Sequence, residues 1–555
     1  MAEPEKIILE PYYYRDNFLR LCDTVEAQYD DILDDGDHAL LRRFRNLQFN
    51  AQCLYIRLTS RTGPWFRESK LLYEELGDPG PAVDELLREN MAAEPGGLST
   101  EELSKLYTQY ELLQIFAGNL GEQRFSNKTS LLNAIDTLAL GDKEILQAIA
   151  AFEDARIIAP AAMERVQNLQ ILFFGNRRQS LTEFVLQDLG VTRYYPYTLN
   201  REHRLFSCRA ALDEYLDCAA LSDGHYELLE QQEQTQLPAL AEEVLARVIS
   251  FTSSENRWHR LCNKLARDLE RLQEWDLALQ LYARSQRHPA RERRARILEK
   301  NSDWATAVTL CQEIIARPWC EAELEAAGRI LPRVKRKLDG GRLPRRKDDF
   351  EHTQLRLPPG PGSVELKAAS HLQDQWQSVH YVENGLMTAL FGLAFWGQVF
   401  APVPGVFNNP FQSAPTDMYD PAFATRRQAG ITARIEELRV ADLPAMLAEA
   451  CERYQHYQCR WIDWRRIDAE RVADAAAHIP GEHLLAIWER ILFDPGENRR
   501  GFPDLIAFGT GMADYCMIEV KGPGDALQDN QKRWLRYFAE QGIPAQVAWV
   551  EWTDD

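Results

Sequence analysis

Two short polar sequences near the end of the chain carry residue types that suit metal chemistry. Pro503-Asp504 comes first, and Glu519-Val520-Lys521 follows it. Apolar residues follow Asp504 and precede Glu519, with glycines between the two runs, which predicts two strands joined by a turn. Side chains alternate along a strand, so Glu519 and Lys521 project from one face while Val520 points into a core. We therefore expect two carboxylates and one amine to share a surface.

Those groups match the needs of phosphodiester hydrolysis. Oxygen ligands suit Mg²⁺ or Mn²⁺, which polarises a phosphoryl oxygen and lowers the pKa of a bound water. Asp504 and Glu519 supply carboxylates, and the Val520 carbonyl offers a third oxygen. Lys521 is placed to orient or deprotonate the attacking water, or to offset charge on the phosphorane. This PD…ExK spacing is typical of metal-dependent DNA nucleases, but an ordinary hairpin with solvated charges at its ends also fits it.

The sequence after Lys521 favours the nuclease interpretation. A turn at 522–525 precedes a predicted helix from Leu527 to Gln541, whose apolar residues recur at helical spacing, and a last strand covers 545–552. Strand, strand, helix, strand is the core order of the restriction-endonuclease-like fold. Gln531, near the start of the helix, is either a surface residue or one that faces the metal-bound phosphate.

Several stretches then resemble one nuclease family. G-F-P-D-L-I-A-F (501–508) and M-I-E-V-K-G-P-G-D-A-L-Q-D-N-Q-K-R-W-L (517–535) closely resemble the VRR-NUC module, and in particular that of the Fanconi-associated nucleases. The run from Tyr381 to Trp396 resembles the opening helix of that module, and Phe407 to Tyr419 is a further match. These stretches make the resemblance far more specific than the motif alone.

The resemblance adds a third carboxylate and a substrate. Glu383 matches a glutamate that binds metal in the family, whereas by itself a glutamate in the first turn of a helix more often complements the helix dipole. The implied activity is that of a structure-selective endonuclease and 5′ exonuclease with Mn²⁺ or Mg²⁺. The implied substrate is 5′-flap or branched DNA held by its duplex arms, in DNA repair that includes interstrand crosslinks. The predicted catalytic set is Glu383, Asp504, Glu519, Lys521 and Gln531.

Composition indicates the class of protein and its compartment. The chain has 555 residues, 45% hydrophobic and 27% charged, which predicts a folded protein of several domains. Its ten cysteines show neither CxxC nor zinc-finger spacing, so we expect a reducing compartment and no structural zinc. Compared with the longer members of the family that it resembles, we expect this chain to lack the N-terminal ubiquitin-binding zinc finger. Neither a secretory signal nor a membrane span is evident. We expect a cytoplasmic protein without membrane contact, associated with the nucleoid if it is bacterial.

A net charge of −20 is unusual for a protein that binds DNA, but the basic residues are clustered. Residues 284–300 are rich in arginine, and Arg291, Arg293 and Arg294 are our candidate phosphate contacts there. Residues 50–67 resemble a DNA-contacting part of the nuclease family, which adds the candidates Arg57, Arg61 and Arg67. Solvated surface charge is the alternative for both groups.

The chain is predicted to be multidomain, with mostly α-helical N-terminal and repeat-like domains before a C-terminal α/β restriction-endonuclease-like (PD-D/E-x-K) nuclease domain. Trp275-x-x-Ala278-x-x-Leu281 recurs as Trp304-x-x-Ala307-x-x-Leu310, which predicts stacked helical hairpins of tetratricopeptide type. The predicted divisions are a DNA-contacting domain (1–95), a helical domain with a SAP-like segment (96–235), a tetratricopeptide-like domain (236–340), a linker (341–370) and the VRR-NUC domain (371–555).

Two other functions remain open from the sequence. A Holliday-junction-resolvase-like nuclease would share the metal site, although such enzymes are usually small and cut symmetrically as dimers. A non-catalytic helical scaffold that binds DNA or protein would need no metal site, and the complete set of Glu383, Asp504, Glu519 and Lys521 argues against it.

Overall fold

The computed structural model describes residues 11–61, 63–121, 123–179, 193–341 and 347–553. The chain divides into two compact units, Met1–Thr192 and Arg193–Asp555. Among the described residues, no helix is both long enough and apolar enough to cross a membrane. All ten cysteines are unpaired, and nine of them are buried.

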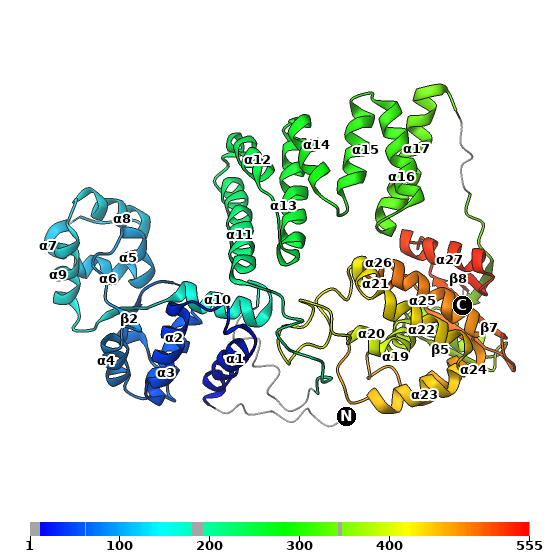
Figure 1. Ribbon diagram of the computed structural model, residues 1–555, viewed down its shortest axis with the longest axis horizontal. Helices are drawn as coiled ribbons and strands as arrows, with labels where there is room; N and C mark the ends of the chain where they lie inside the picture. Colours follow the sequence, from blue (N-terminus) through cyan, green and yellow to red (C-terminus); the bar gives the residue numbers. More distant parts are fainter. Residues whose placement is uncertain (1–10, 62, 122, 180–192, 342–346, 554–555) are drawn as a thin grey trace. The chain divides into compact units, whose positions relative to one another are not determined.

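The first unit is helical with one small antiparallel sheet (Figure 1). Its helices are α1 (Tyr13–Tyr29), α2 (Asp35–Asn46), α3 (Phe49–Thr59), α4 (Gly80–Arg88), α5 (Thr100–Leu106), α6 (Gln109–Ile115), α7 (Ala117–Leu120), α8 (Lys128–Thr137), α9 (Asp142–Phe152) and α10 (Met163–Phe174). Its strands are β1 (Phe66–Arg67), β2 (Ala92–Ala93) and β3 (Ile157–Pro160), in the order β1-β3-β2. Helices α5 to α9 enclose a core of their own between β2 and β3. The SAP-like segment falls within this insertion.

The second unit begins with a series of antiparallel helices (Figure 1). They are α11 (Arg209–Glu230), α12 (Leu237–Ala246), α13 (Thr252–Arg271), α14 (Trp275–Arg284), α15 (Ala290–Lys300), α16 (Trp304–Ala316) and α17 (Glu321–Asp339). The repeated tryptophans start α14 and α16, and the alanine and leucine of each copy are buried. The predicted helical hairpins are thus confirmed. The domain boundary at 235 is not, because α11 packs on α13 and belongs to the repeat helices.

The nuclease domain surrounds a five-stranded sheet. Its strands are β4 (His352–Leu357), β5 (Ser378–Tyr381), β6 (Leu505–Phe508), β7 (Tyr515–Lys521) and β8 (Ala545–Trp552). Its helices are α18 (Val364–Leu372), α19 (Gly385–Ala394), α20 (Trp396–Val399), α21 (Ala422–Arg426), α22 (Gln428–Val440), α23 (Leu443–Tyr454), α24 (Ala469–His478), α25 (Gly481–Phe493), α26 (Pro495–Asn498) and α27 (Asp529–Gln541). The strand order is β4-β8-β7-β6-β5, with β8 parallel to both neighbours and β5-β6-β7 antiparallel.

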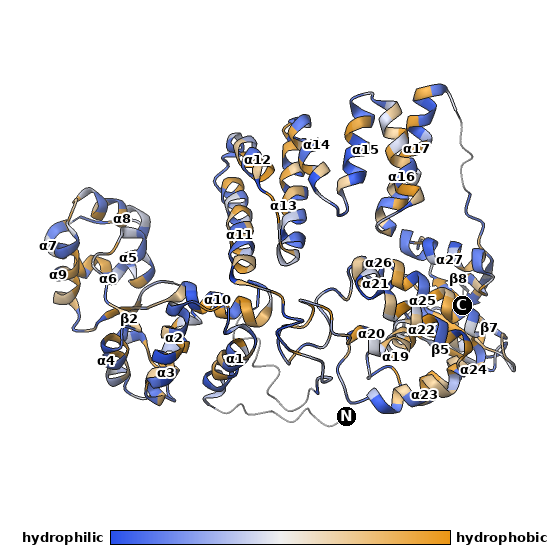
Figure 2. Cartoon of the chain, viewed as in Figure 1, coloured by the Kyte–Doolittle hydropathy of each residue, from blue (hydrophilic) through white to orange (hydrophobic). Residues whose placement is uncertain are grey.

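Apolar residues cover both faces of this sheet. Ala507 and Ile518 face a core that includes residues of α18, whereas Ile506 and Met517 face a larger core built by α19, α22, α23, α25 and α27. Figure 2 shows that α27 itself is hydrophilic along much of its length, so this helix contributes one apolar stripe to the larger core and exposes the rest.

The segment predicted as a linker, 341–370, needs correction. Residues 342–346 lie outside the described residues, but β4 and α18 fall within 341–372 and join the nuclease sheet. In β4, Leu355 and Leu357 alternate into the core. The glycines and prolines that flank this short strand conceal its period-two pattern in the sequence. The nuclease domain therefore includes residues well before 371.

Candidate active site

The two halves of the PD…ExK motif meet where β6 and β7 lie side by side. The Val520 N–H donates to Oδ2 of Asp504 at 2.9 Å. The Lys521 amine lies 2.8 Å from Oε1 of Glu519, and the Glu519 side chain is 1% exposed. The observed strands agree closely with the predicted ones. The apolar runs beside the motif residues are buried along their whole length in β6 and β7, at the centre of the sheet.

Strand alternation sorts the side chains of β7 as predicted. Tyr515 and Met517 point into the larger core, and Glu519 and Lys521 continue that same face. Val520 is 2% exposed and packs into the opposite core. The charged residues thus begin where the apolar contacts of this face end.

Glu383 approaches Asp504 through the backbone. The N–H groups of Val382 and Glu383 donate to the Asp504 carbonyl at 2.9 and 3.2 Å. Asn384 has a φ of +53°, and its side-chain oxygen accepts from the Phe502 N–H at 3.1 Å. Asparagine tolerates this left-handed conformation better than most residues, and it turns the chain from β5 into α19. Glu383 therefore lies in the turn before α19, and the expectation of a residue in the first turn of a helix is corrected.

The carboxylate of Glu383 has a local partner, because the Tyr381 hydroxyl donates to its Oε2. Among the residues that the structure describes, no three acidic, histidine or cysteine side chains are arranged to hold one ion. Glu383 and Glu365 are nevertheless near enough to raise the pKa of Asp504. Sequence reasoning missed Tyr381 and Glu365. Glu365 lies in the first turn of α18, in the segment assigned to a linker, and no sequence signal marks it.

The electrostatics of this cluster favour a cation. Burial and the neighbouring Asp504 raise the pKa of Glu519 to about 8, even though Lys521 donates to its carboxylate. Burial also raises the pKa of Asp504, with Glu365 and Glu383 adding to the effect. A buried group of like charges is unfavourable unless positive charge compensates it. An all-oxygen donor set of this kind fits a hard divalent ion.

Helix α27 supplies a second polar partner of Glu519 besides Lys521. The Gln531 amide donates from Nε2 to Oε1 of Glu519 at 2.6 Å, and its own oxygen accepts from the Gln528 N–H at 2.8 Å. Because Gln528 caps the helix, α27 starts two residues later than the sequence predicted. Gly501 has a φ of +86°, and a Cβ there would lie 2.8 Å from the Asn530 carbonyl carbon. Glycine thus lets α27 approach the Pro503-Asp504 loop.

Comparison with known proteins agrees with this arrangement. The family model for the VRR-NUC domain matches residues 439–552, and that for the FAN1 HTH domain matches residues 12–92. A Fanconi-associated nuclease 1 homolog of Pseudomonas aeruginosa is 35% identical over 98% of this chain and 97% of its own length. The chain belongs to the Fanconi-associated nuclease family. It is therefore a nuclease, and divalent-metal dependence follows from the family.

Other members of the family show how far the likeness extends. The human Fanconi-associated nuclease 1 is 24% identical over 97% of this chain and 62% of its own length. The crystal structure of paFAN1 bound to DNA with a two-nucleotide 5′ flap and a gap superimposes with a TM-score of 0.81 at 34% identity, covering 99% of this chain and all of that one. The helical domains of this chain thus share the family fold together with the nuclease domain.

The structure divides the six predicted DNA-contacting arginines by their surroundings. Arg67 is 6% exposed and lies 2.7 Å from both Glu111 and Glu153. Arg291 pairs with Glu323 and stacks on Trp319, and Arg293 pairs with Glu270. Carboxylates within the chain pair with these three guanidinium groups, and these ion pairs compete with phosphate binding. The assignment of Arg67, Arg291 and Arg293 to phosphate stays a prediction.

The other three differ in their freedom to bind phosphate. Arg57 pairs with Glu75 at 2.5 Å and stacks on Tyr14. Arg61 is exposed, donates to the Tyr73 hydroxyl at 3.0 Å and lies over the ring of Phe66. Arg294 is half-buried, and no carboxylate in the part of the chain that the structure describes pairs with it. Arg57, Arg61 and Arg294 all stay predicted DNA contacts, and Arg57 is the one of the three that is paired with a carboxylate.

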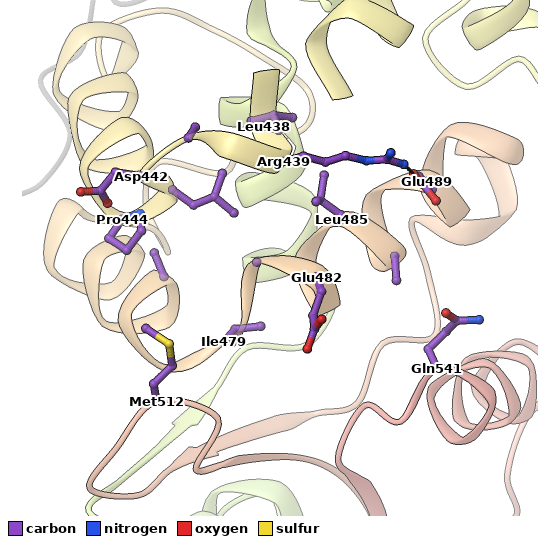
Figure 3. Close-up of a pocket in the computed structure, with 15 residues that line it drawn as sticks. Leu438, Arg439, Asp442, Pro444, Ile479, Glu482, Leu485, Glu489, Met512 and Gln541 are labelled. Carbon is purple, nitrogen blue, oxygen red and sulfur yellow. Dashed lines mark hydrogen bonds and ion pairs between the residues drawn. The ribbon is translucent and has the colours of Figure 1, made fainter. Parts of the chain in front are cut away.

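A cavity of about 640 Å³ lies elsewhere in the nuclease domain (Figure 3). It is lined by residues of α22, α23 and α25 together with Met512 and Gln541, and none of the predicted catalytic residues lines it. The motif residues lie outside this cavity, at the start of β6 and the end of β7.

Proposed function

We propose that this nuclease cuts 5′-flap and related branched DNA as a structure-selective endonuclease with 5′ exonuclease activity. The observation that carries the proposal is the match, along 99% of this chain, to a family member solved with 5′-flap DNA. A second structure of that protein, with a one-nucleotide flap, matches with a TM-score of 0.76. Repair of branched and crosslinked DNA is the proposed role, and the proposed location is the cytoplasm, at the nucleoid if the protein is bacterial.

We assign the metal site to the carboxylates of Glu383, Asp504 and Glu519 and to the Val520 carbonyl. Support comes from the backbone contact between Glu383 and Asp504 and from the raised pKa of Glu519 and Asp504. Mg²⁺ or Mn²⁺ bound there would polarise the scissile phosphate and lower the pKa of a water. On metal binding, the Glu383 carboxylate would give up its hydrogen bond from the Tyr381 hydroxyl and bind the ion instead.

The remaining polar groups fix geometry and charge. The Lys521 amine, 2.8 Å from Glu519, is placed to stabilise the negative charge that develops on the phosphorane. The Gln531 amide holds Oε1 of Glu519 from the opposite element, α27. Outer contacts of this kind orient a metal-binding carboxylate, and their loss typically reduces metal affinity or activity about 10- to 100-fold.

The test uses purified protein with 5′-flap, splayed and four-way DNA, in Mn²⁺, Mg²⁺ or chelator. We expect metal-dependent cutting of the flap substrate. Asp504→Ala should abolish cutting while DNA binding, followed by fluorescence anisotropy, stays at the wild-type level. Symmetric cutting of the four-way junction would favour a resolvase instead. Absence of cutting on every substrate would favour a scaffold, and normal cutting by Asp504→Ala would remove the assigned site.

A further inference from the structure

The last repeat helix joins the nuclease domain through a buried polar cluster, which we call the α17 junction. Its charged and polar residues come from α17, from the α25–α26 region and from α27. They are Glu321, Glu325, Arg490, Asp494, Asn498 and Arg533. Four of the six are less than 9% exposed, so few of these contacts are shared with water.

One carboxylate in the junction caps two helices. Oδ2 of Asp494 accepts from the Glu321 N–H at 3.0 Å, at the start of α17, where the N-cap Cys320 offers no side-chain acceptor. Oδ1 of the same residue accepts from the Glu497 N–H at 3.2 Å, at the start of α26. The first turn of α17 is thus completed by the nuclease domain.

The side chain of Glu321 is held from the nuclease side. Its Oε1 lies 2.8 Å from Arg490 and 3.0 Å from the Asn498 amide, and the residue is 3% exposed. A buried charge that loses its partner is strongly destabilising, so these three groups fix one another in one arrangement. Arg490 also stacks on Tyr537 of α27, which extends the junction to the helix that carries Gln531.

Arg533 links α17 directly to that helix. Its Nε donates to Glu325 at 2.8 Å, and it lies 4.0 Å from Glu321. Arg533 is two residues from Gln531, which holds Glu519 through a 2.6 Å hydrogen bond. A displacement of the start of α27 by about 1 Å would stretch that bond past the roughly 3.5 Å limit of a hydrogen bond. The position of Glu519 therefore depends on where α27 is anchored.

We propose that Arg533 is a positioning residue: its contact with Glu325 of α17 anchors α27, so that Gln531 holds Glu519 in place for the metal. The proposal rests on the proposed metal site. It makes the end of the repeat domain part of the catalytic apparatus, because the last repeat helix and the carboxylate proposed to bind the ion are both held by α27.

Arg536 provides a matched control on the same helix. It makes an ion pair of similar geometry, 2.6 Å to Asp348, but with the segment before β4 and not with α17. Arg533→Gln and Glu325→Ala break the anchor from its two sides. Glu325 is 24% exposed, so its replacement should leave the chain folded even if Arg533→Gln does not. Arg533→Lys keeps the charge and tests for rescue.

Three measurements on the full chain separate positioning from stability alone. Hydrogen exchange of residues 528–535 in chelator reports on the start of α27 without metal. Calorimetric titration with Mn²⁺ reports on the site, and kcat and KM on 5′-flap DNA report on turnover. In both anchor variants we expect faster exchange, weaker Mn²⁺ binding and a lower kcat with unchanged KM. The expected loss of Mn²⁺ affinity is about threefold to tenfold, because loss of an outer contact typically costs about 10-fold or more and Arg533 acts one step further from the ion. The double variant should be no weaker than either single one.

Arg536→Gln should leave exchange and Mn²⁺ affinity unchanged. If both anchor variants match Arg536→Gln in exchange and in Mn²⁺ affinity, the junction serves stability alone and the proposal is overturned. Wild-type protein that binds no Mn²⁺ would instead overturn the proposed metal site. The exchange measurement in chelator remains a test of the anchor in that case, so the two failures are distinguishable.

Discussion

Replacing Glu519 with glutamine should make the metal-free protein more stable while it abolishes catalysis. Glu519 is 1% exposed beside Asp504, and its pKa rises from an ordinary 4.5 to about 8. At pH 7 the folded protein therefore favours the protonated acid, whereas the unfolded chain favours the carboxylate. Glutamine has the shape of the protonated acid and its side-chain oxygen still accepts from Gln531. The substitution therefore keeps the contacts and removes the cost of protonating the carboxylate on folding.

The size of the effect follows from these two values. Protonating a carboxyl of pKa 4.5 at pH 7 costs about 3 kcal/mol, since each pH unit is worth about 1.4 kcal/mol. The free energy of unfolding of the Glu519→Gln variant should therefore be higher by about that amount. For the second unit this corresponds to a rise of about 5 °C in melting temperature. When folding raises the pKa of a carboxyl, the free energy of unfolding of the protein falls as the pH rises from the unfolded pKa to the folded pKa. The advantage of glutamine should therefore vanish near pH 4.5 and grow up to about pH 8.

Thermal and urea unfolding in chelator between pH 5 and 8 measures this difference. Glu551→Gln, an exposed carboxylate on the neighbouring strand β8, is the control and should change little. Added Mg²⁺ should stabilise the wild type and leave Glu519→Gln unaffected, because only the carboxylate binds the ion. A variant no more stable than wild type, or one whose advantage is the same at pH 5 and pH 8, would refute the argument from buried like charge.

Three further outcomes are expected. Arg61→Glu and Arg294→Glu should each weaken DNA binding and reduce its salt dependence by about one phosphate contact, measured by anisotropy from 50 to about 200 mM salt; unchanged slopes would remove these residues from the interface. Arg67→Ala should lower the free energy of unfolding of the first unit by about 3 kcal/mol, because two partly buried carboxylates lose their partner; a neutral result in urea titration would contradict the structural role. Burial lowers the pKa of His225 despite its 3.0 Å contact with Asp268, so the unfolded state binds more protons and stability should fall as pH drops below about 6.5. His225→Gln should flatten that dependence in urea titrations at several pH values, and an equally steep dependence in the variant would exclude this histidine as its cause.

Local patterns in the sequence were sufficient for the centre of the nuclease sheet. Residues 515–521 and 545–552 form strands with the bounds expected, because apolar runs of that length between turns have few alternatives. The edge strands β4 and β5 were missed. They are short, carry polar residues on their exposed side, and are stabilised by pairing with β8 and β6 rather than by a pattern of their own.

The arginines show why charge clusters in a sequence do not define a binding surface. Arg291, Arg293 and Arg294 are neighbours in the chain, yet the first two are neutralised by glutamates from α17 and α13. Those partners lie 32 and 23 residues away in sequence, respectively. Only the packing of the repeat helices determines which basic residues remain available.

By itself the sequence determined the chemistry of this protein: a proline-aspartate and a glutamate-lysine pair at the ends of adjacent strands, and a family resemblance that extends along the chain. Tertiary structure decided where Glu383 lies, which element holds Glu519, and how α17 reaches α27. The physical reason is that strand periodicity and turn formation depend on residues that are close together in the sequence. The state of a buried carboxylate or guanidinium depends instead on partners that only folding brings within a few ångströms.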